Sequence, residues 1–285
     1  MGQPDRQGAQ VSGHEPTVLV ERDGHVATLF LNRPHRRNAW TGRMHGEYRA
    51  ALATLDADPE VRAIVVTGTP PAFCVGGDSD ALAGHAERGG YQSGLREDAA
   101  QPGHGVAPEF EADFAYHFGL RVPVIAAVNG AAAGVGLALA LFCDLRFGAA
   151  DAKLTTAAPK LGLPAEYGTS WLLPRLIGIT RAADLLLSGR VVTPAETAEW
   201  GLWNGVEPDG EATLTTARAY ARQLATTVGP AALATTKRQL WLDQLHGSPA
   251  KAVLDSQVLL EQAMATAEYR EGVAALREKR PPRFG

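Results

Sequence analysis

Two glycine-containing segments are the places where a ligand can approach the main chain most closely. They are Val75-Gly-Gly-Asp78 and Gly134-Val-Gly136, and the second opens a predicted helix over residues 135–141. Because glycine has no Cβ, such segments expose backbone N–H groups to a ligand, and a helix N-terminus adds partial positive charge. Taken singly, each segment is better explained as a tight turn.

Side chains that bind metals or exchange electrons are sparse. The sequence has only two cysteines, Cys74 and Cys143, each in an apolar, small-residue context and without a CxxC motif or Cys/His cluster. We interpret both as buried free thiols and predict no metal site. His85, His104 and His117 stand alone, and solvent-exposed side chains explain them more simply than substrate contacts do.

The overall composition excludes several classes of protein. The net charge is -4, and no Lys/Arg cluster interleaved with aromatics provides a surface for nucleic acid. The longest apolar stretch, residues 122–128, is too short to span a membrane, and the polar N-terminus lacks the apolar core of a secretion signal. We expect a soluble, cytoplasmic protein with a flexible leader over residues 1–15.

Strands and helices alternate through the first two thirds of the chain. Residues 18–31 predict a hairpin that turns at Asp23-Gly24, and Thr41 is a candidate cap for a helix to about residue 56. Further strands are predicted at 61–67, 122–128 and 145–149, with the helix at 135–141 between the last two. This alternation predicts an α/β fold with crossover connections.

Two other regions have a different character. The stretch 78–118 is rich in Gly, His, Glu and Asp and predicts an irregular segment, either a mobile substrate loop or a disordered insert. After Pro194 the pattern becomes helical, with predicted helices over residues 194–199, 212–226, 230–245 and 248–276.

The long segment Pro123–Asp144, with its strand, glycine-rich turn and helix, resembles the signature of the enoyl-CoA hydratase/isomerase (crotonase) superfamily. Residues 31–39, 72–78, 189–202 and 271–284 are also similar to that family, so that the resemblance covers about residues 17–284. It implies a crotonase-like spiral of ββα repeats over 16–200 and a C-terminal helical trimerisation module over 201–285. It also implies a coenzyme A thioester as substrate, no separate cofactor, and a homotrimer or dimer of trimers.

The resemblance places the two donors of an oxyanion hole on the N–H groups of Gly77 and Val135, where the family usually has glycine in place of the valine. Each such donor to a developing enolate oxygen is worth about 2.7–4 kcal/mol. The implied substrate-binding residues are Val75, Gly76, Asp78, Gly134, Ala138, Ala158, Leu163 and Tyr167. Asp78 is also a candidate cap for the helix that follows, and Asp144 is expected to be a structural hydrogen-bond acceptor.

Both glutamates that a hydratase of this family uses fall on alanines, Ala138 and Ala158. The segment 162–175 is instead similar to the 1,2-epoxyphenylacetyl-CoA isomerases, which carry an acidic residue at the place of Glu166. The 4-chlorobenzoyl-CoA dehalogenases, with an aspartate nucleophile there, are similar too. We therefore predict Glu166 as the catalytic residue, with its pKa raised by partial burial beside Leu163, Tyr167 and Trp171.

Four functions remain open from the sequence. A single carboxylate beside an oxyanion hole suits double-bond isomerisation best. The alternatives are hydration with Glu166 alone positioning water, hydrolysis with Glu166 as nucleophile or base, and a CoA-binding scaffold in which Glu166 only decorates a turn before the helix near Thr169. The segment 81–118 is expected to select the acyl group, whose identity the sequence leaves undetermined.

Overall fold

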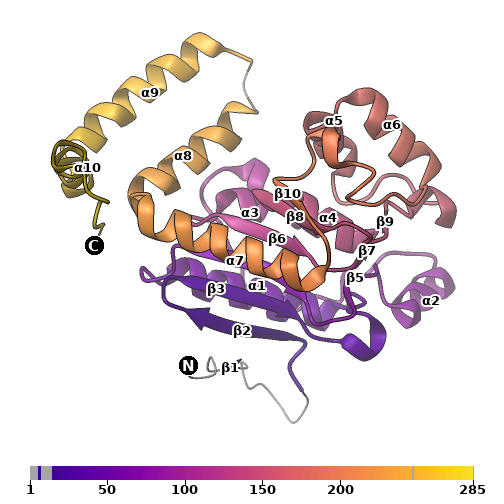
Figure 1. Cartoon of the computed structure of the whole chain (residues 1–285). Coiled ribbons are helices and arrows are strands. Elements are labelled where there is room, and N and C mark those ends of the chain that lie inside the picture. Colours follow the sequence, from indigo (N-terminus) through magenta and orange to yellow (C-terminus); the bar gives the residue numbers. More distant parts are fainter. Residues whose placement is uncertain (1–5, 8–14, 246, 285) are drawn as a thin grey trace.

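The computed structural model describes residues 6–7, 15–245 and 247–284, which form two sheets surrounded by helices (Figure 1). The seven-stranded sheet has the order β1-β2-β3-β4-β6-β8-β10, and the three-stranded sheet has the order β5-β7-β9. The strands of the large sheet are β1 Arg6–Gln7, β2 Val18–Asp23, β3 Val26–Leu31, β4 Ala63–Gly68, β6 Val124–Val128, β8 Leu145–Ala149 and β10 Gly205–Glu207; those of the small sheet are β5 Ala72–Cys74, β7 Ala131–Ala133 and β9 Leu154–Thr155.

From β4 to β9, successive strands alternate between the two sheets. β4, β6 and β8 join the large sheet, and the strand that follows each of them joins the small one. All of these pairs are parallel, and only β1–β2 and β2–β3 are antiparallel. Each repeat thus contributes one strand to the large sheet and the next strand to the small sheet. This arrangement is the predicted crotonase-like α/β spiral.

The helices belong to three groups along the chain. Those of the first half are η1 Pro34–Arg36, α1 Gly42–Ala57, α2 Ser79–Arg88, η2 Pro108–Phe110, α3 Tyr116–Gly119 and α4 Val135–Phe142. The middle ones are η3 Ala158–Leu161, α5 Thr169–Ile177, α6 Ile179–Ser188 and η4 Ala198–Trp200, and the C-terminal ones are α7 Gly210–Thr227, α8 Pro230–Asp243, α9 Pro249–Met264 and α10 Ala267–Glu278.

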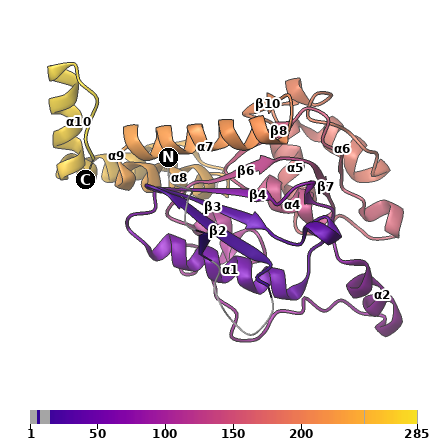
Figure 2. The ribbon, with the colours of Figure 1, turned by 60° about the horizontal axis from the view of Figure 1, so that its bottom comes forward.

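Helices cover both faces of the large sheet, with α7 on one face and α1 on the other (Figure 2). Helix α7 places Ala217, Ala221 and Ala225 on one stripe, and these pack against strand residues such as Val65 and Ile125. Small side chains at this spacing let the helix approach the sheet closely. Helix α4 is apolar throughout, and all eight of its residues are buried.

The C-terminal helices α8 to α10 lie at the opposite end of the molecule from α2, α5 and α6 (Figures 1 and 2). Helix α9 has no buried residue and exposes a set of large apolar side chains. These are Val253, Leu254, Val258, Leu260 and Met264. None of the described helices is long and apolar enough to cross a bilayer.

Several local predictions are confirmed. The hairpin turns between Asp23 and Val26, where β2 and β3 pair in register. The hydroxyl of Thr41 accepts a hydrogen bond from the Met44 N–H at 3.2 Å and so caps α1. The predicted strands at 61–67, 122–128 and 145–149 correspond to β4, β6 and β8.

Three predictions about helices are wrong. Residues 194–199 are not a helix, because only the short 3₁₀ turn η4 forms there. The single helix over 248–276 is two helices, since the Thr266 hydroxyl accepts from the Tyr269 N–H and starts α10 afresh. The segment 78–118 is not irregular throughout, because it contains α2, η2 and α3.

Most of the predicted leader over residues 1–15 lies outside the described residues. The division between a core over 16–200 and a helical module over 201–285 stays a prediction. Strand β10 and helix α7 both follow residue 201, and both pack with the large sheet.

Candidate active site

The small sheet brings the two glycine segments together. β5 and β7 are parallel neighbours with Cys74 opposite Ala132, and β9 pairs with the other side of β7. Because the carboxyl ends of parallel strands meet at one edge of a sheet, the segments after β5, β7 and β9 converge there. Gly76 has a φ of 107°, and a Cβ at Gly136 would clash with the Cys74 carbonyl oxygen. Glycine at both positions permits this close approach.

The N–H groups of Gly77 and Val135, the predicted oxyanion-hole donors, make no hydrogen bond among the described residues. The Trp40 N–H donates to the Gly76 carbonyl at 2.8 Å, and the Asp78 N–H donates to the Trp40 carbonyl at 2.9 Å, so the two bonds bracket Gly77. Within the described part of the chain, neither the Gly77 N–H nor the Val135 N–H has a hydrogen-bond partner. The Val135 side chain packs in the hydrophobic core. A valine at this position therefore leaves the N–H of the helix N-terminus without a partner among the described residues.

Asp78 performs a structural task beside Gly77. Its carboxylate accepts from the Asp80 N–H at 3.0 Å, which confirms the predicted cap of α2. It also forms an ion pair with Arg33 at 2.9 Å. Burial opposes the charge, but the Arg33 guanidinium and the Asp80 N–H together hold the pKa of Asp78 below its usual value.

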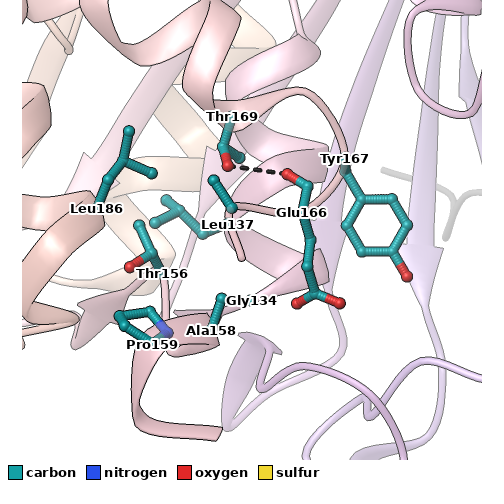
Figure 3. Close-up of a pocket in the computed structure, with 10 residues that line it drawn as sticks. Gly134, Leu137, Thr156, Ala158, Pro159, Glu166, Tyr167, Thr169 and Leu186 are labelled. Atoms are coloured by element: carbon teal, nitrogen blue, oxygen red, sulfur yellow. Dashed lines mark hydrogen bonds between the residues drawn. The ribbon is translucent and has the colours of Figure 1, made fainter. Parts of the chain in front are cut away.

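A pocket lies next to the segments that follow β7 and β9, and the Glu166 side chain extends into it (Figure 3). Its lining residues are Gly134, Leu137, Thr156, Ala158, Pro159, Ala165, Glu166, Tyr167, Thr169 and Leu186. The Glu166 side chain runs between the Tyr167 ring on one side and Ala158 and Gly134 on the other (Figure 3). The free space is about 10 Å³, which is about the smallest volume that holds one water molecule.

The pocket unites four of the eleven predicted site residues, namely Gly134, Ala158, Glu166 and Tyr167. The predicted residues outside its lining are Val75, Gly76, Gly77, Asp78, Val135, Ala138 and Leu163. Of these, Ala138 is buried within α4, and Leu163 is exposed. The lining residues that the sequence analysis missed are Leu137, Thr156, Pro159, Ala165, Thr169 and Leu186.

Of the described residues that line the pocket, only Glu166 carries a carboxylate. It is half-buried, and burial raises its pKa. Its backbone carbonyl accepts from the N–H and the hydroxyl of Thr169, at 3.0 and 2.8 Å. Its carboxylate has no hydrogen-bond or ion-pair partner among the described residues. The main chain of Glu166 therefore shapes the turn before α5, while its side chain remains free.

Tyr167 holds the turn that carries Glu166. Its φ is 49°, in the left-handed region that bulky side chains avoid. Its ring meets the Phe114 ring edge to face at 5.3 Å, and its hydroxyl lies 3.4 Å from that of Tyr91. Burial raises the pKa of Tyr167, with smaller contributions from Tyr91 and Glu166.

Backbone strain concentrates around this site. Six of the described non-glycine residues have a positive φ. Five of them flank the site, namely Arg37, Asn38, Phe114, Ala157 and Tyr167. The sixth, Lys279, lies away from the site at the end of α10. The Arg37 carbonyl accepts from the Val75 N–H, and Ala157 directly precedes Ala158. Because such residues cost about 1–3 kcal/mol each and cluster at functional sites, their placement supports this region as the site.

A buried network of histidine and tyrosine lies behind the pocket. The prediction of an exposed His117 is wrong: its side chain is fully buried, with one ring nitrogen 2.7 Å from the Tyr48 hydroxyl and the other 2.7 Å from the Phe114 carbonyl. Burial lowers the pKa of His117 to about 3 and that of His45 to about 4. His104, in contrast, is exposed as predicted, and His85 is partly buried.

The cysteines behave as predicted. Cys74 and Cys143 are free thiols, and both are buried. Burial raises the pKa of each to about 12, so neither forms a reactive thiolate near neutral pH.

Comparison with known proteins decides the family. The model of the enoyl-CoA hydratase/isomerase family matches residues 21–285. The chain belongs to the enoyl-CoA hydratase/isomerase family. A 1,2-epoxyphenylacetyl-CoA isomerase of Escherichia coli K12 is 36% identical over 283 residues, which cover 94% of this chain and 97% of that relative. A probable enoyl-CoA hydratase of Mycobacterium tuberculosis is 35% identical over 274 residues, with the same coverage of 94% and 97%.

The structure agrees with this assignment to the enoyl-CoA hydratase/isomerase family. A crystal structure of a probable enoyl-CoA hydratase/isomerase from Mycobacterium abscessus matches with a TM-score of 0.82 at 35% identity, covering 94% of this chain and 98% of the other. The crotonase superfamily that the sequence resembled is therefore confirmed, including the similarity to an isomerase. Relatives with hydratase and isomerase names match equally well, so the reaction must be inferred from the site.

Proposed function

We propose that the protein isomerises the double bond of an enoyl-CoA, with Glu166 moving the proton. The Glu166 carboxylate removes a proton from C2 of a 3-enoyl thioester, and the electron pair delocalises onto the thioester oxygen as a dienolate. The N–H groups of Gly77 and Val135 hydrogen-bond that oxygen. The protonated Glu166 then returns the proton to C4, which gives the conjugated 2-enoyl thioester.

One observation carries this proposal: among the described residues, a single carboxylate lines the pocket, and it has no hydrogen-bond or ion-pair partner there. A base that moves one proton between two carbons needs only one carboxylate, provided that its pKa lies close to the working pH. Burial raises the pKa of Glu166 in that direction. The E. coli relative named 1,2-epoxyphenylacetyl-CoA isomerase adds support by analogy.

The same pocket argues against the usual two-carboxylate hydration. Ala158 lines the pocket, and Ala138 is buried in α4, so neither position supplies a second acid or base. The rival function is hydration by Glu166 alone, and one feature favours it. The free space beside Glu166 suits one water molecule.

We also propose a CoA thioester as the substrate, with no additional cofactor. The assembly that we propose is a homotrimer or a dimer of trimers, in which the apolar side chains of α9 are covered. A cytoplasmic location fits this function, without a nucleic-acid or membrane partner.

Product analysis tests the proposal. The purified protein is incubated with a 3-enoyl-CoA and, separately, with a 2-enoyl-CoA, and the products are identified by mass spectrometry and ultraviolet absorbance. We expect conjugation of the 3-enoyl substrate at unchanged mass. A product heavier by one water establishes the hydratase, free CoA establishes the hydrolase, and binding without turnover establishes a scaffold. Each of these three results would contradict the isomerase proposal.

A further inference from the structure

Phe114 has an unusual combination of backbone strain and complete burial. Its φ is 64°, and its side chain is fully buried. A bulky residue in the left-handed region is strained, and such strain persists only where the surroundings fix it. Behind the ring, the Phe114 carbonyl accepts from the ring of His117, which the Tyr48 hydroxyl holds in turn at 2.7 Å. The residue is therefore anchored through its backbone as well as through its ring.

The Phe114 ring joins the two halves of the proposed site. On one side it meets the Trp40 ring edge to face at 5.6 Å, and the backbone of Trp40 forms the two hydrogen bonds that bracket Gly77. On the other side it meets the Tyr167 ring at 5.3 Å, and Tyr167 adjoins Glu166 in a strained turn. One buried side chain thus contacts Trp40, whose backbone brackets Gly77, and Tyr167, which directly follows Glu166.

We infer that Phe114 is a positioning residue, which sets the placement of the Glu166 carboxylate relative to the Gly77 N–H. This inference rests on the proposed function for its effect on turnover. Proton transfer to and from a bound thioester requires both groups at the correct separation, and a displacement of about 1 Å can cost about 100-fold in rate. The ring contacts that link Phe114 to the site are those with Trp40 and Tyr167, so its effect passes through these two residues.

The same segment contains a matched control residue. Phe110 is 2% exposed, lies four positions before Phe114 and meets the ring of Phe118 at 5.9 Å. Among the described residues it has no ring contact with Trp40 or Tyr167. Phe110→Leu and Phe114→Leu remove similar apolar volume from one region, and only the second breaks the link between the two halves of the site.

Steady-state kinetics of the two leucine variants provides the first readout. For Phe114→Leu we expect kcat to fall by about tenfold or more while KM changes by less than about threefold, because positioning affects the transition state more than binding. For Phe110→Leu we expect kcat within about twofold of the wild type, because a substitution away from the site affects stability alone. Equal effects of the two variants on kcat would overturn the inference.

A second readout does not depend on turnover. Glu166 is labelled with a water-soluble carbodiimide and an amine over a range of pH, and the modified peptide is quantified by mass spectrometry. When the Tyr167 ring loosens in Phe114→Leu, Glu166 gains solvent, so we expect faster labelling and a titration midpoint at lower pH than in the wild type and in Phe110→Leu. Identical labelling of all three proteins would overturn the inference. If labelling changes while the wild type fails to isomerise the substrate, the positioning role stands and the proposed function falls.

Discussion

The two ends of helix α4 differ in how their polar groups are used. At the C-terminal end, the Arg146 guanidinium donates to the carbonyls of Leu141 and Cys143, at 3.0 and 2.5 Å. At the N-terminal end, the Val135 N–H has no partner among the described residues and faces the same edge as Gly77. Arg146 therefore satisfies carbonyl groups at one end of the helix, and the other end keeps the N–H that we propose for the substrate oxygen.

Two carboxylates show the same contrast. Asp144, just after α4, accepts from the Val124 N–H at 2.7 Å and from the Trp241 indole at 2.8 Å, and it forms an ion pair with Lys237 at 2.8 Å. The predicted role as a structural acceptor is thereby confirmed. Glu166 has no side-chain partner among the described residues. Asp144 thus holds α8 to the core, whereas we propose that the Glu166 carboxylate acts on the substrate.

The largest change in activity is expected from Glu166→Gln, which tests the difference between Glu166 and Asp144. Removal of a general base costs about 10²–10⁴-fold in rate, so kcat should fall by that factor. Because the carboxylate makes no hydrogen bond within the described chain, the free energy of unfolding should change by less than about 0.5 kcal/mol. Enzyme kinetics and urea unfolding measure the two quantities. Glu109→Gln, at an exposed position, serves as the control and should alter neither.

Asp144→Asn should show the reverse behaviour. The substitution leaves the buried Lys237 ammonium without its counter-charge, which costs about 3–5 kcal/mol of stability. Urea unfolding checks this value, and the activity of the protein that remains folded should stay near that of the wild type. The exposed pair of Asp184 and Arg190 is the control, because an exposed ion pair is worth about 0–1 kcal/mol. If Asp144→Asn lowered the free energy of unfolding as little as Asp184→Asn does, the structural role of Asp144 would be contradicted.

The next effect is a loss of stability in acid. His117 and His45 have folded-state pKa values of about 3 and about 4, below the ordinary histidine value of 6.5, because both side chains are buried. At pH values between the folded-state pKa and 6.5, the unfolded chain binds more protons than the folded protein. The free energy of unfolding therefore falls as the pH decreases below 6.5. The expected slope is about 1.4 kcal/mol per pH unit for each histidine. His117→Asn should reduce the slope of urea-unfolding free energy against pH, and His104→Gln, at an exposed site, should not.

The smallest effect concerns the pH dependence of activity. The base form of Glu166 is the carboxylate, and burial raises its pKa. The value of kcat/KM should therefore fall as the pH decreases, with a midpoint above the usual range of a glutamate. Kinetics between pH 4 and pH 8, in buffers that keep the wild type folded, determine the midpoint. A midpoint at or below the ordinary glutamate value would show that the base lies in a more polar environment than the pocket provides.

Much of the fold follows from local sequence patterns. The hairpin over residues 18–31 and the cap at Thr41 depend on neighbouring residues alone, and so they could be predicted. The break before α10 also carries a local signal, because Thr266 is a good cap residue.

The candidate site was predictable only in part. Resemblance pointed to Gly77, Val135 and Glu166, but the pocket wall includes Leu186 on α6, a helix that was not predicted. The burial of His117 depends on Tyr48, which is 69 residues away in the sequence. The positive φ of Phe114 has no local sequence signal, because the residue is neither a glycine nor an asparagine, the types that commonly adopt this conformation. Such features depend on tertiary contacts, which periodicity does not encode.

The transfer of a labelled proton tests the central assignment most directly. A 3-enoyl-CoA carrying deuterium at C2 is incubated with the wild type and with Glu166→Gln, and the label is located by mass spectrometry and NMR. Our account predicts that the wild type removes deuterium from C2 as the double bond moves into conjugation, and that Glu166→Gln does so about 100-fold more slowly or worse. Equal rates of deuterium loss in the two proteins, or a hydrated product, would contradict it.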